Sequence, residues 1–290
     1  APYIQRNIDQ TQIAYGIGPN NVTTEQYAGV STLTPSQQRD QVNQDVQLRV
    51  LDPNVVSQTF EQLQQQRSFY AFEDSLDVDR YQLNKTGGPT DVVIGTRNVN
   101  LGGLQTNQRN WINDHLVYTH GYGVVAAQAD SAQSDGSPDF VESDLPPTGA
   151  ISDSQPDQTF QPRIYFGEGS PNYSIVGAPA TTRPRELDRP NDTSTGQINT
   201  TYEGGGGVPV GSFFRQLLYA WKFKDKNILL SSGVNSDSRI LYIRDPRARV
   251  AKVAPWLTLD GDPYPVVVDG KILWVVDGYT TSDGFPYSEQ

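Results

Sequence analysis

The chain has 290 residues, enough for one large domain or two ordinary ones, and it contains no Cys and no Met. The lack of Cys excludes disulfides, thiol catalysis and the usual structural zinc sites. With 33 acidic and 22 basic residues the net charge is −11, which argues against a nucleic-acid partner, because such proteins present a basic face to phosphates.

No apolar run reaches the ~18–20 residues that span a bilayer, and no signal peptide opens the chain. The chain begins at Ala1 without an initiator Met, so we expect an excised fragment or a processed product.

The first half begins with a predicted helix over residues 2–15, ended by Gly16, and a polar surface excursion over residues 17–45. Asp52 followed by Pro53 predicts the start of a second helix, which runs to about Tyr70, because Asp caps and Pro suits the first helical position. An apolar run predicts a strand over residues 91–99.

The segment Arg109–Gln128 holds both histidines of the chain. We predict a helix with Trp111 and His115 on one side, stopped by Gly121 and Gly123. His115 and His120 are five residues apart, roughly 140° around a helix, so they do not form the i, i+4 pair that clamps a metal. Either imidazole could serve as a base, or both His115 and His120 could be buried structural residues.

Residues 126–160 carry six Asp, one Glu and no basic residue. We interpret this stretch as a solvated acidic connector loop. Its Asp130, Asp135 and Asp139 are the candidates for a cation site, although no metal and no cofactor is expected.

The second half begins with predicted short strands at residues 163–166 and 173–176, then a long irregular passage over residues 179–211. Four glycines end this passage without the Gly-Lys-Ser/Thr of a phosphate loop. Ser212 predicts the cap of a helix with a buried apolar stripe: Phe213, Phe214, Leu217, Leu218 and Trp221.

Further strands are predicted at residues 228–231 and 239–243, and Asp245 with Pro246 predicts another helix. The turn Asp269-Gly270 between two apolar runs is typical of a type I′ hairpin. Both runs are apolar on both faces, so we expect this hairpin to be central and covered in its sheet.

These elements predict an α+β fold, with a mostly antiparallel sheet, helices packed on its faces and two long irregular loops. We expect an N-terminal lobe over residues 1–125, the acidic connector over 126–160 and a strand-rich C-terminal lobe over 161–290. The two lobes are expected to form one composite domain.

Segments along nearly the whole chain carry a resemblance: PYIQRNI, FEQLQQQRSFYAF, RNWINDHLVYTHGYG, GVPVGSFFRQLLYAWKF and DGDPYPVVVDGKILWVVDGYTTS. In this order they resemble the extracytoplasmic region of uncharacterised protein family 0182, large multi-pass membrane proteins of actinobacteria and cyanobacteria. The resemblance implies transmembrane helices elsewhere in the protein and a location outside the cytoplasmic membrane. It implies no catalytic assignment.

The favoured function is therefore a binding or assembly domain of a cell-envelope membrane protein. Its expected partners are its own transmembrane region, other envelope proteins and a glycan or lipid ligand. Candidate contact residues are Tyr118, His120, Tyr122, Tyr264 and Tyr279, and the aromatic and proline-rich segment at 285–287 also suits binding.

Two alternatives remain open. One is an envelope hydrolase or transferase. Its base would be His120 or His115, oriented by Asp114, Asp260 or Asp262, or its catalysis would rest on a carboxylate pair drawn from Asp260, Asp262, Asp277 and Glu168. No Gly-x-Ser-x-Gly elbow is present to seat a serine nucleophile. The other alternative is a structural scaffold of a larger membrane complex.

Overall fold

The computed structural model describes residues 2–23, 33–39, 49–83, 88–155, 160–191 and 196–281. The chain separates after residue 46 into two compact units. In the first unit, helix α1 (Pro2–Ala14) confirms the predicted N-terminal helix, and nearly all of its side chains are exposed. The polar excursion at residues 17–45 is described only at 17–23 and 33–39.

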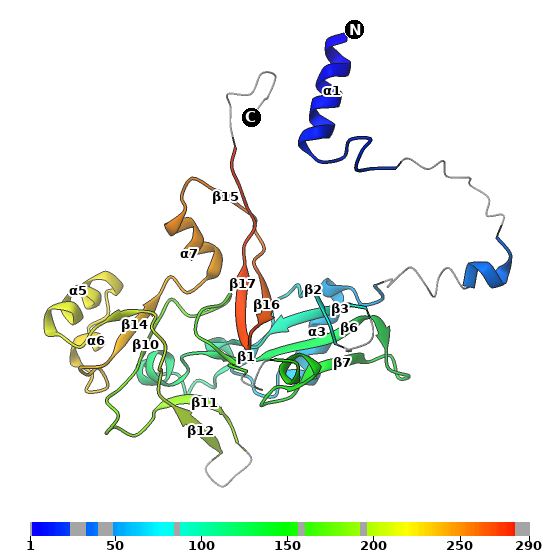
Figure 1. Ribbon diagram of the computed structural model, residues 1–290. Coiled ribbons are helices and arrows are strands. Elements are labelled where there is room, and N and C mark those ends of the chain that lie inside the picture. The colour runs from blue at the N-terminus through cyan, green and yellow to red at the C-terminus, as the bar shows by residue number, and fades with distance from the viewer. Residues whose placement is uncertain are drawn as a thin grey trace. The chain divides into compact units, whose positions relative to one another are not determined.

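The second unit is built around one antiparallel five-stranded sheet in the order β2-β3-β6-β7-β8 (Figure 1). Its strands are β2 (Asp77–Tyr81), β3 (Thr90–Thr96), β6 (Val124–Ala132), β7 (Pro138–Ser143) and β8 (Thr148–Gly149). The strand predicted over residues 91–99 is β3 and the short β4 (Asn98–Val99). The α+β fold with antiparallel sheets is confirmed.

Apolar side chains cover both faces of this sheet. Helix α3 (Pro53–Gln64) packs Val56 and Phe60 against one face, and the Asp52 carboxylate caps it by accepting from Asn54 N at 3.0 Å. The helix begins where predicted but ends at Gln64, before Tyr70. On the other face, Ile151 and Val267 join the core of β3 and β6.

The acidic connector predicted over residues 126–160 is wrong as a loop, because this stretch holds most of β6, all of β7 and β8, and helix α4 (Ala150–Asp153). The strands were missed because we took the acidic residues to face solvent, whereas some of them have structural roles. The buried Glu142 carboxylate accepts from the backbone of Ile151 and Ser152 at 3.1 and 2.9 Å and so anchors the start of α4.

A smaller antiparallel sheet in the order β10-β14-β13 lies beside helices α5 and α6 (Figure 1). Its strands are β10 (Tyr173–Val176), β13 (Val208–Pro209) and β14 (Arg239–Tyr242), and the helices are α5 (Phe213–Phe223) and α6 (Asn227–Leu230). Residues 228–231, predicted as a strand, belong mainly to α6, whose Ile228 enters the core.

Helix α5 is confirmed, but its predicted orientation is wrong. The apolar stripe from Phe213 to Trp221 is exposed, and Ala220 packs inward together with the partly buried Tyr219 and Phe223. Both sides of α5 are apolar, so spacing alone did not show which side faces the core. The Ser212 side chain makes no capping hydrogen bond.

The predicted hairpin is confirmed as β16 (Tyr264–Val268) and β17 (Lys271–Val275). Asp269 and Gly270 have φ values of 49° and 70°, as a type I′ turn requires. Its predicted central position is wrong, because the hairpin forms a two-stranded sheet. Val267 packs on the central sheet while Leu273 stays exposed, so only one face of the hairpin is covered.

The passage over residues 179–211 is less irregular than predicted, because β11 (Glu186–Pro190) and β12 (Gln197–Thr200) form a hairpin in it. Helix α7 (Pro246–Val253) begins as predicted, with Asp245 accepting from Ala248 N at 2.6 Å. Other short elements are β1 (Tyr70–Ala71), η1 (Leu101–Gly103), β5 (Gly121–Tyr122), β9 (Arg163–Ile164), β15 (Thr258–Leu259) and β18 (Gly278–Tyr279).

Strands β5 and β9 pair with each other, so the segments predicted as N- and C-terminal lobes share a ladder. The lobe boundary predicted at residue 125 falls inside β6. Among the residues that the structure describes, no helix is both long and apolar enough to cross a bilayer.

Gly121 is required by a close backbone approach. A Cβ added there would lie 2.2 Å from the Arg97 carbonyl oxygen, which accepts from Tyr122 N at 2.9 Å. We therefore expect Gly121→Ala to lower the free energy of unfolding by about 2–4 kcal/mol, because the backbones must separate. Urea denaturation followed by circular dichroism measures this difference.

Gly88→Ala is the matched control, since a Cβ there meets nothing within 4 Å. We expect its midpoint to stay close to that of the wild type. Equal stability of the Gly121→Ala and Gly88→Ala variants would contradict the steric requirement at residue 121.

Candidate functional site

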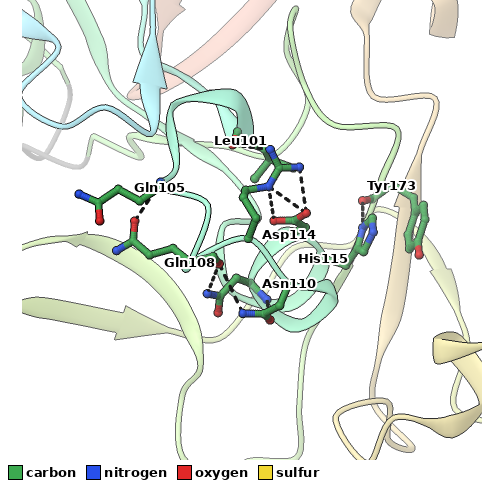
Figure 2. A network of polar contacts seen from close by, with 9 residues as sticks. Leu101, Gln105, Gln108, Asn110, Asp114, His115 and Tyr173 are labelled. Atoms are coloured by element: carbon green, nitrogen blue, oxygen red, sulfur yellow. Dashed lines mark hydrogen bonds and ion pairs between the residues drawn. The ribbon is translucent and has the colours of Figure 1, made fainter.

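The histidine segment begins with a polar network that fixes one short helix (Figure 2). Arg109 binds both carboxylate oxygens of Asp114, at 3.0 and 3.1 Å from Nε, and donates to the Leu101 carbonyl at 2.9 Å. The helix continues as the π-helix η2 (Asn113–Val117), where Tyr118 N donates to Asn113 O at 2.9 Å. It ends before Gly121, which opens β5 instead of stopping the helix as predicted.

His115 is held against Tyr173 (Figure 2). Its Nδ1 lies 3.0 Å from the Tyr173 carbonyl oxygen, and the two rings stack at 3.9 Å with an interplanar angle of 4°. The Asp225 carboxylate accepts from Trp111 Nε1 at 2.7 Å and from Tyr173 Oη at 2.6 Å. Burial lowers the pKa of His115, so the ring is mainly neutral at pH 7.

His120 is buried, and its side chain has no exposed surface. Nδ1 lies 3.0 Å from Thr119 Oγ1, and Nε2 lies 3.8 Å from Asp188 Oδ1, which is longer than a hydrogen bond. The ring packs at 4.5 Å from that of Tyr165. Burial lowers the pKa of His120, and its side chain is enclosed by protein atoms.

The buried Glu186 carboxylate organises the surroundings of His120. It accepts from Thr119 Oγ1 at 3.2 Å, from Tyr165 Oη at 3.0 Å, and from the backbone N–H groups of Gly177 and Tyr202 at 2.9 and 3.0 Å. Burial, together with the charge of Glu186, raises the pKa of Tyr165, so its hydroxyl stays a donor. These four bonds satisfy a carboxylate that burial would otherwise destabilise.

A pocket of about 400 Å³ borders this network, because Tyr165 and Tyr202 also line the pocket. Aromatic side chains line it together with two cations: Tyr165, Phe166, Tyr202, Trp274, Arg163 and Lys271. Arg163 is held by the Asp188 carboxylate, and Trp274 Nε1 donates to the Phe166 carbonyl at 2.9 Å. His120 is not among the lining residues; Tyr165 is the side chain that contacts both the ring of His120 and the pocket.

The other predicted contact tyrosines do not gather in one place. Tyr118 packs on the Phe69 ring at 5.0 Å, and Tyr122 is buried in β5. Tyr264 and Tyr279 belong to two different two-stranded sheets. The segment at residues 285–287 lies outside the described residues.

Two of the three candidate metal residues, Asp135 and Asp139, accept hydrogen bonds at the turn between β6 and β7. Asp135 accepts from Ser137 N and Oγ at 3.0 and 2.6 Å, and these bonds lower the pKa of Asp135. Asp139 accepts from Ser131 and Gln133, while Asp130 lies in β6. In the part of the chain that the structure describes, no three His, Cys, Asp or Glu side chains are placed to hold a metal ion.

Two of the four predicted carboxylates come together. Burial and the charges of Glu73, Asp77 and Asp262 raise the pKa of Glu168 to about 8. Burial, with Asp262 and Glu73, raises the pKa of Asp77 to about 7. Sequence reasoning missed Glu73 and did not connect Asp77 with Glu168, because nothing local links residues about ninety positions apart. Asp260 and Asp277 instead meet through their backbones, Asp260 N donating to Asp277 O at 2.9 Å.

The comparisons with known proteins give one family over nearly the whole chain. The model of the uncharacterised protein family UPF0182 matches residues 1–290. This chain belongs to that family. A UPF0182 protein of Arthrobacter sp. (strain FB24) is 48% identical over 289 residues, 99% of this chain and 28% of that protein.

Other relatives give the same picture. The UPF0182 protein of Kineococcus radiotolerans is 49% identical over 99% of this chain and 27% of its own length, and that of Tropheryma whipplei is 50% identical over 99% and 29%. The chain therefore spans less than a third of the relatives that it matches. No solved structure matches it.

The cluster of Glu73, Asp77, Glu168 and Asp262 predicts a pH dependence of stability. The folded state holds protons on Asp77 and Glu168 up to about pH 7 and 8, whereas the unfolded chain has lost them by about pH 5. Stability must therefore fall as the pH rises from 6 to 9. Since water screens half-buried carboxyls, we expect the melting temperature to fall by only roughly 2–4 °C.

Differential scanning fluorimetry at constant ionic strength measures this fall. Glu168→Gln should make it shallower, while Glu203→Gln, at an exposed position, should leave it unchanged. A melting temperature that stays flat or rises from pH 6 to pH 9 would refute the assignment.

Proposed function

We propose that this chain is an extracytoplasmic binding or assembly domain within a multi-pass envelope membrane protein. The observation that carries the binding role is the open pocket lined by Tyr165, Trp274, Arg163 and Lys271. Aromatic faces suit sugar rings and other flat groups, and the two cations suit an anionic substituent. The ligand class that fits is therefore an acidic glycan or an anionic lipid headgroup.

Two features support a role as one part of a larger protein. The chain spans between 27% and 29% of the length of the three relatives described above. Large apolar side chains are also exposed outside helix α5, among them Leu230 at the end of α6 and Trp256 after α7. Exposed apolar groups of this size are typical of surfaces that contact another molecule.

The geometry favours binding over histidine catalysis. A general base must lie within hydrogen-bond reach of the proton that it removes, and the His120 side chain is enclosed. The half-buried His115 uses one ring nitrogen and its stacking face on Tyr173. Both rings thus serve the packing of the histidine segment.

The location can be tested by thiol labelling, since this chain has no native Cys. In the full-length protein, Ser134→Cys places a thiol on the exposed turn after β6. A membrane-impermeant maleimide should label it in intact cells, above the background of the protein without this substitution. Ala126→Cys, at a position with no exposed surface, should react only after denaturation. Labelling of Ser134→Cys only after lysis would place the domain in the cytoplasm and refute the proposal.

The pocket can be tested by photo-crosslinking in native membranes. Leu273 lines the pocket and is 46% exposed, so a photo-reactive phenylalanine there should form an adduct with a glycan or lipid. The same group at Val55 on α3, which is 70% exposed, is the control. Equal adducts at both positions, or none at residue 273, would contradict a ligand in the pocket.

A further inference from the structure

Helix α5 has apolar side chains on two opposite sides. Tyr219, Ala220 and Phe223 face the core of the β10-β14-β13 sheet. The outward stripe consists of Phe213, Phe214, Leu217, Leu218 and Trp221. These five positions fall within roughly 140° of arc on an α-helix, so they form one continuous surface. Phe214 is 67% exposed and Trp221 is 81% exposed, which is far more than a folded core leaves open.

The charges around this stripe have one sign. Exposed Lys222, Lys224 and Lys226 follow it directly, and they are three of the six lysines in a chain whose net charge is −11. Arg215 is exposed on the helix itself. The acidic Asp225 is turned inward, where Trp111 and Tyr173 donate to its carboxylate. The outward side of α5 is therefore apolar and cationic.

The length of α5 limits how the helix can bind a membrane. Its 11 residues extend roughly 16 Å, about half of a ~30 Å hydrocarbon core, so it cannot span one. Interfacial helices place aromatic and aliphatic side chains below the headgroups, with lysines beside the phosphates. Phe, Leu and Trp next to exposed lysines have this composition.

We propose that the outward stripe of α5 binds the surface of an anionic lipid bilayer. Phe213, Phe214, Leu217, Leu218 and Trp221 enter the interface, and Lys222, Lys224 and Lys226 lie against the phosphates. An anionic bilayer fits better than a protein partner, because the cations gather at the stripe in an otherwise acidic chain. This contact is separate from the pocket and needs neither its ligand nor the location tested by thiol labelling.

Vesicle binding by the 290-residue chain tests the proposal. Leu218→Cys carries an environment-sensitive nitrobenzoxadiazole probe, and Ser134→Cys carries the same probe far from the stripe in sequence and on another element. With mixed phosphatidylcholine–phosphatidylglycerol vesicles, we expect the emission at residue 218 to shift to the blue and brighten, and that at residue 134 to stay unchanged. Added salt should weaken the effect.

Two variants separate the apolar and ionic parts. Replacing Lys222, Lys224 and Lys226 by Gln should weaken partitioning into anionic vesicles by about 10- to 100-fold, and Phe214→Ser with Trp221→Ser should abolish the blue shift. Both sets of side chains are exposed, so circular dichroism should match the wild type. Lys222 Nζ also lies 4.4 Å from the centre of the Tyr242 ring, so the lysine replacements should lower the melting temperature slightly.

Three results would overturn the proposal. One is the absence of a spectral shift with anionic vesicles. Another is a shift that the lysine replacements leave unchanged. The last is a concentration-dependent shift without vesicles, which would assign the stripe to a second copy of this chain. None of these results alters the thiol-labelling pattern at residue 134, so failure of this inference is distinguishable from failure of the proposed function.

Discussion

The guanidinium of Arg244, enclosed in the protein, joins three segments that are far apart in the chain. Its nitrogens donate to the Tyr165 carbonyl at 2.7 Å, to Ser174 Oγ at 2.7 Å and to the Thr119 carbonyl at 2.6 Å. Burial lowers the pKa of Arg244 to about 10, so it stays charged at neutral pH. A buried cation is tolerable only when its donors are satisfied, and this requirement fixes the histidine segment against β10 and the wall of the pocket.

Glu186 and Arg97 are two further buried charged side chains, and their hydrogen-bonding atoms must also find partners inside the protein. Glu186 satisfies its oxygens with two hydroxyls and two backbone N–H groups, and Arg97 donates to the carbonyl and the side-chain oxygen of Gln64 at 2.6 and 2.9 Å. His120 is buried beside the Thr119 hydroxyl that donates to Glu186. The two histidines, which the sequence marked as the candidate bases, therefore stabilise the interior. The surfaces that are open to other molecules are formed by other residues.

Local signals predicted the elements whose cause is local. The Asp-Pro starts of α3 and α7 and the Asp-Gly turn of the β16–β17 hairpin need only a few neighbouring residues, and all three are confirmed. Strands β6 and β7 were missed because their acidic residues suggested solvent, whereas Glu142 meets N–H groups of α4. The cluster around Glu168 depends on Glu73 and Asp77, which only the fold brings near.

Helix α5 shows how far an apolar pattern can be read. A stripe of Phe, Leu and Trp indicates that these side chains are removed from water. It does not indicate whether they are buried in the protein's own core or in another molecule or membrane. In α5 only Ala220, Tyr219 and Phe223 pack against the core, whereas the five side chains of the outward stripe are exposed. We infer an anionic surface for the outward side from the exposed Lys222, Lys224 and Lys226 that follow the stripe, because cations beside an apolar surface match anionic headgroups. The charged residues next to an apolar stripe thus help to predict which side of a helix faces outward, and hydrophobic spacing alone does not.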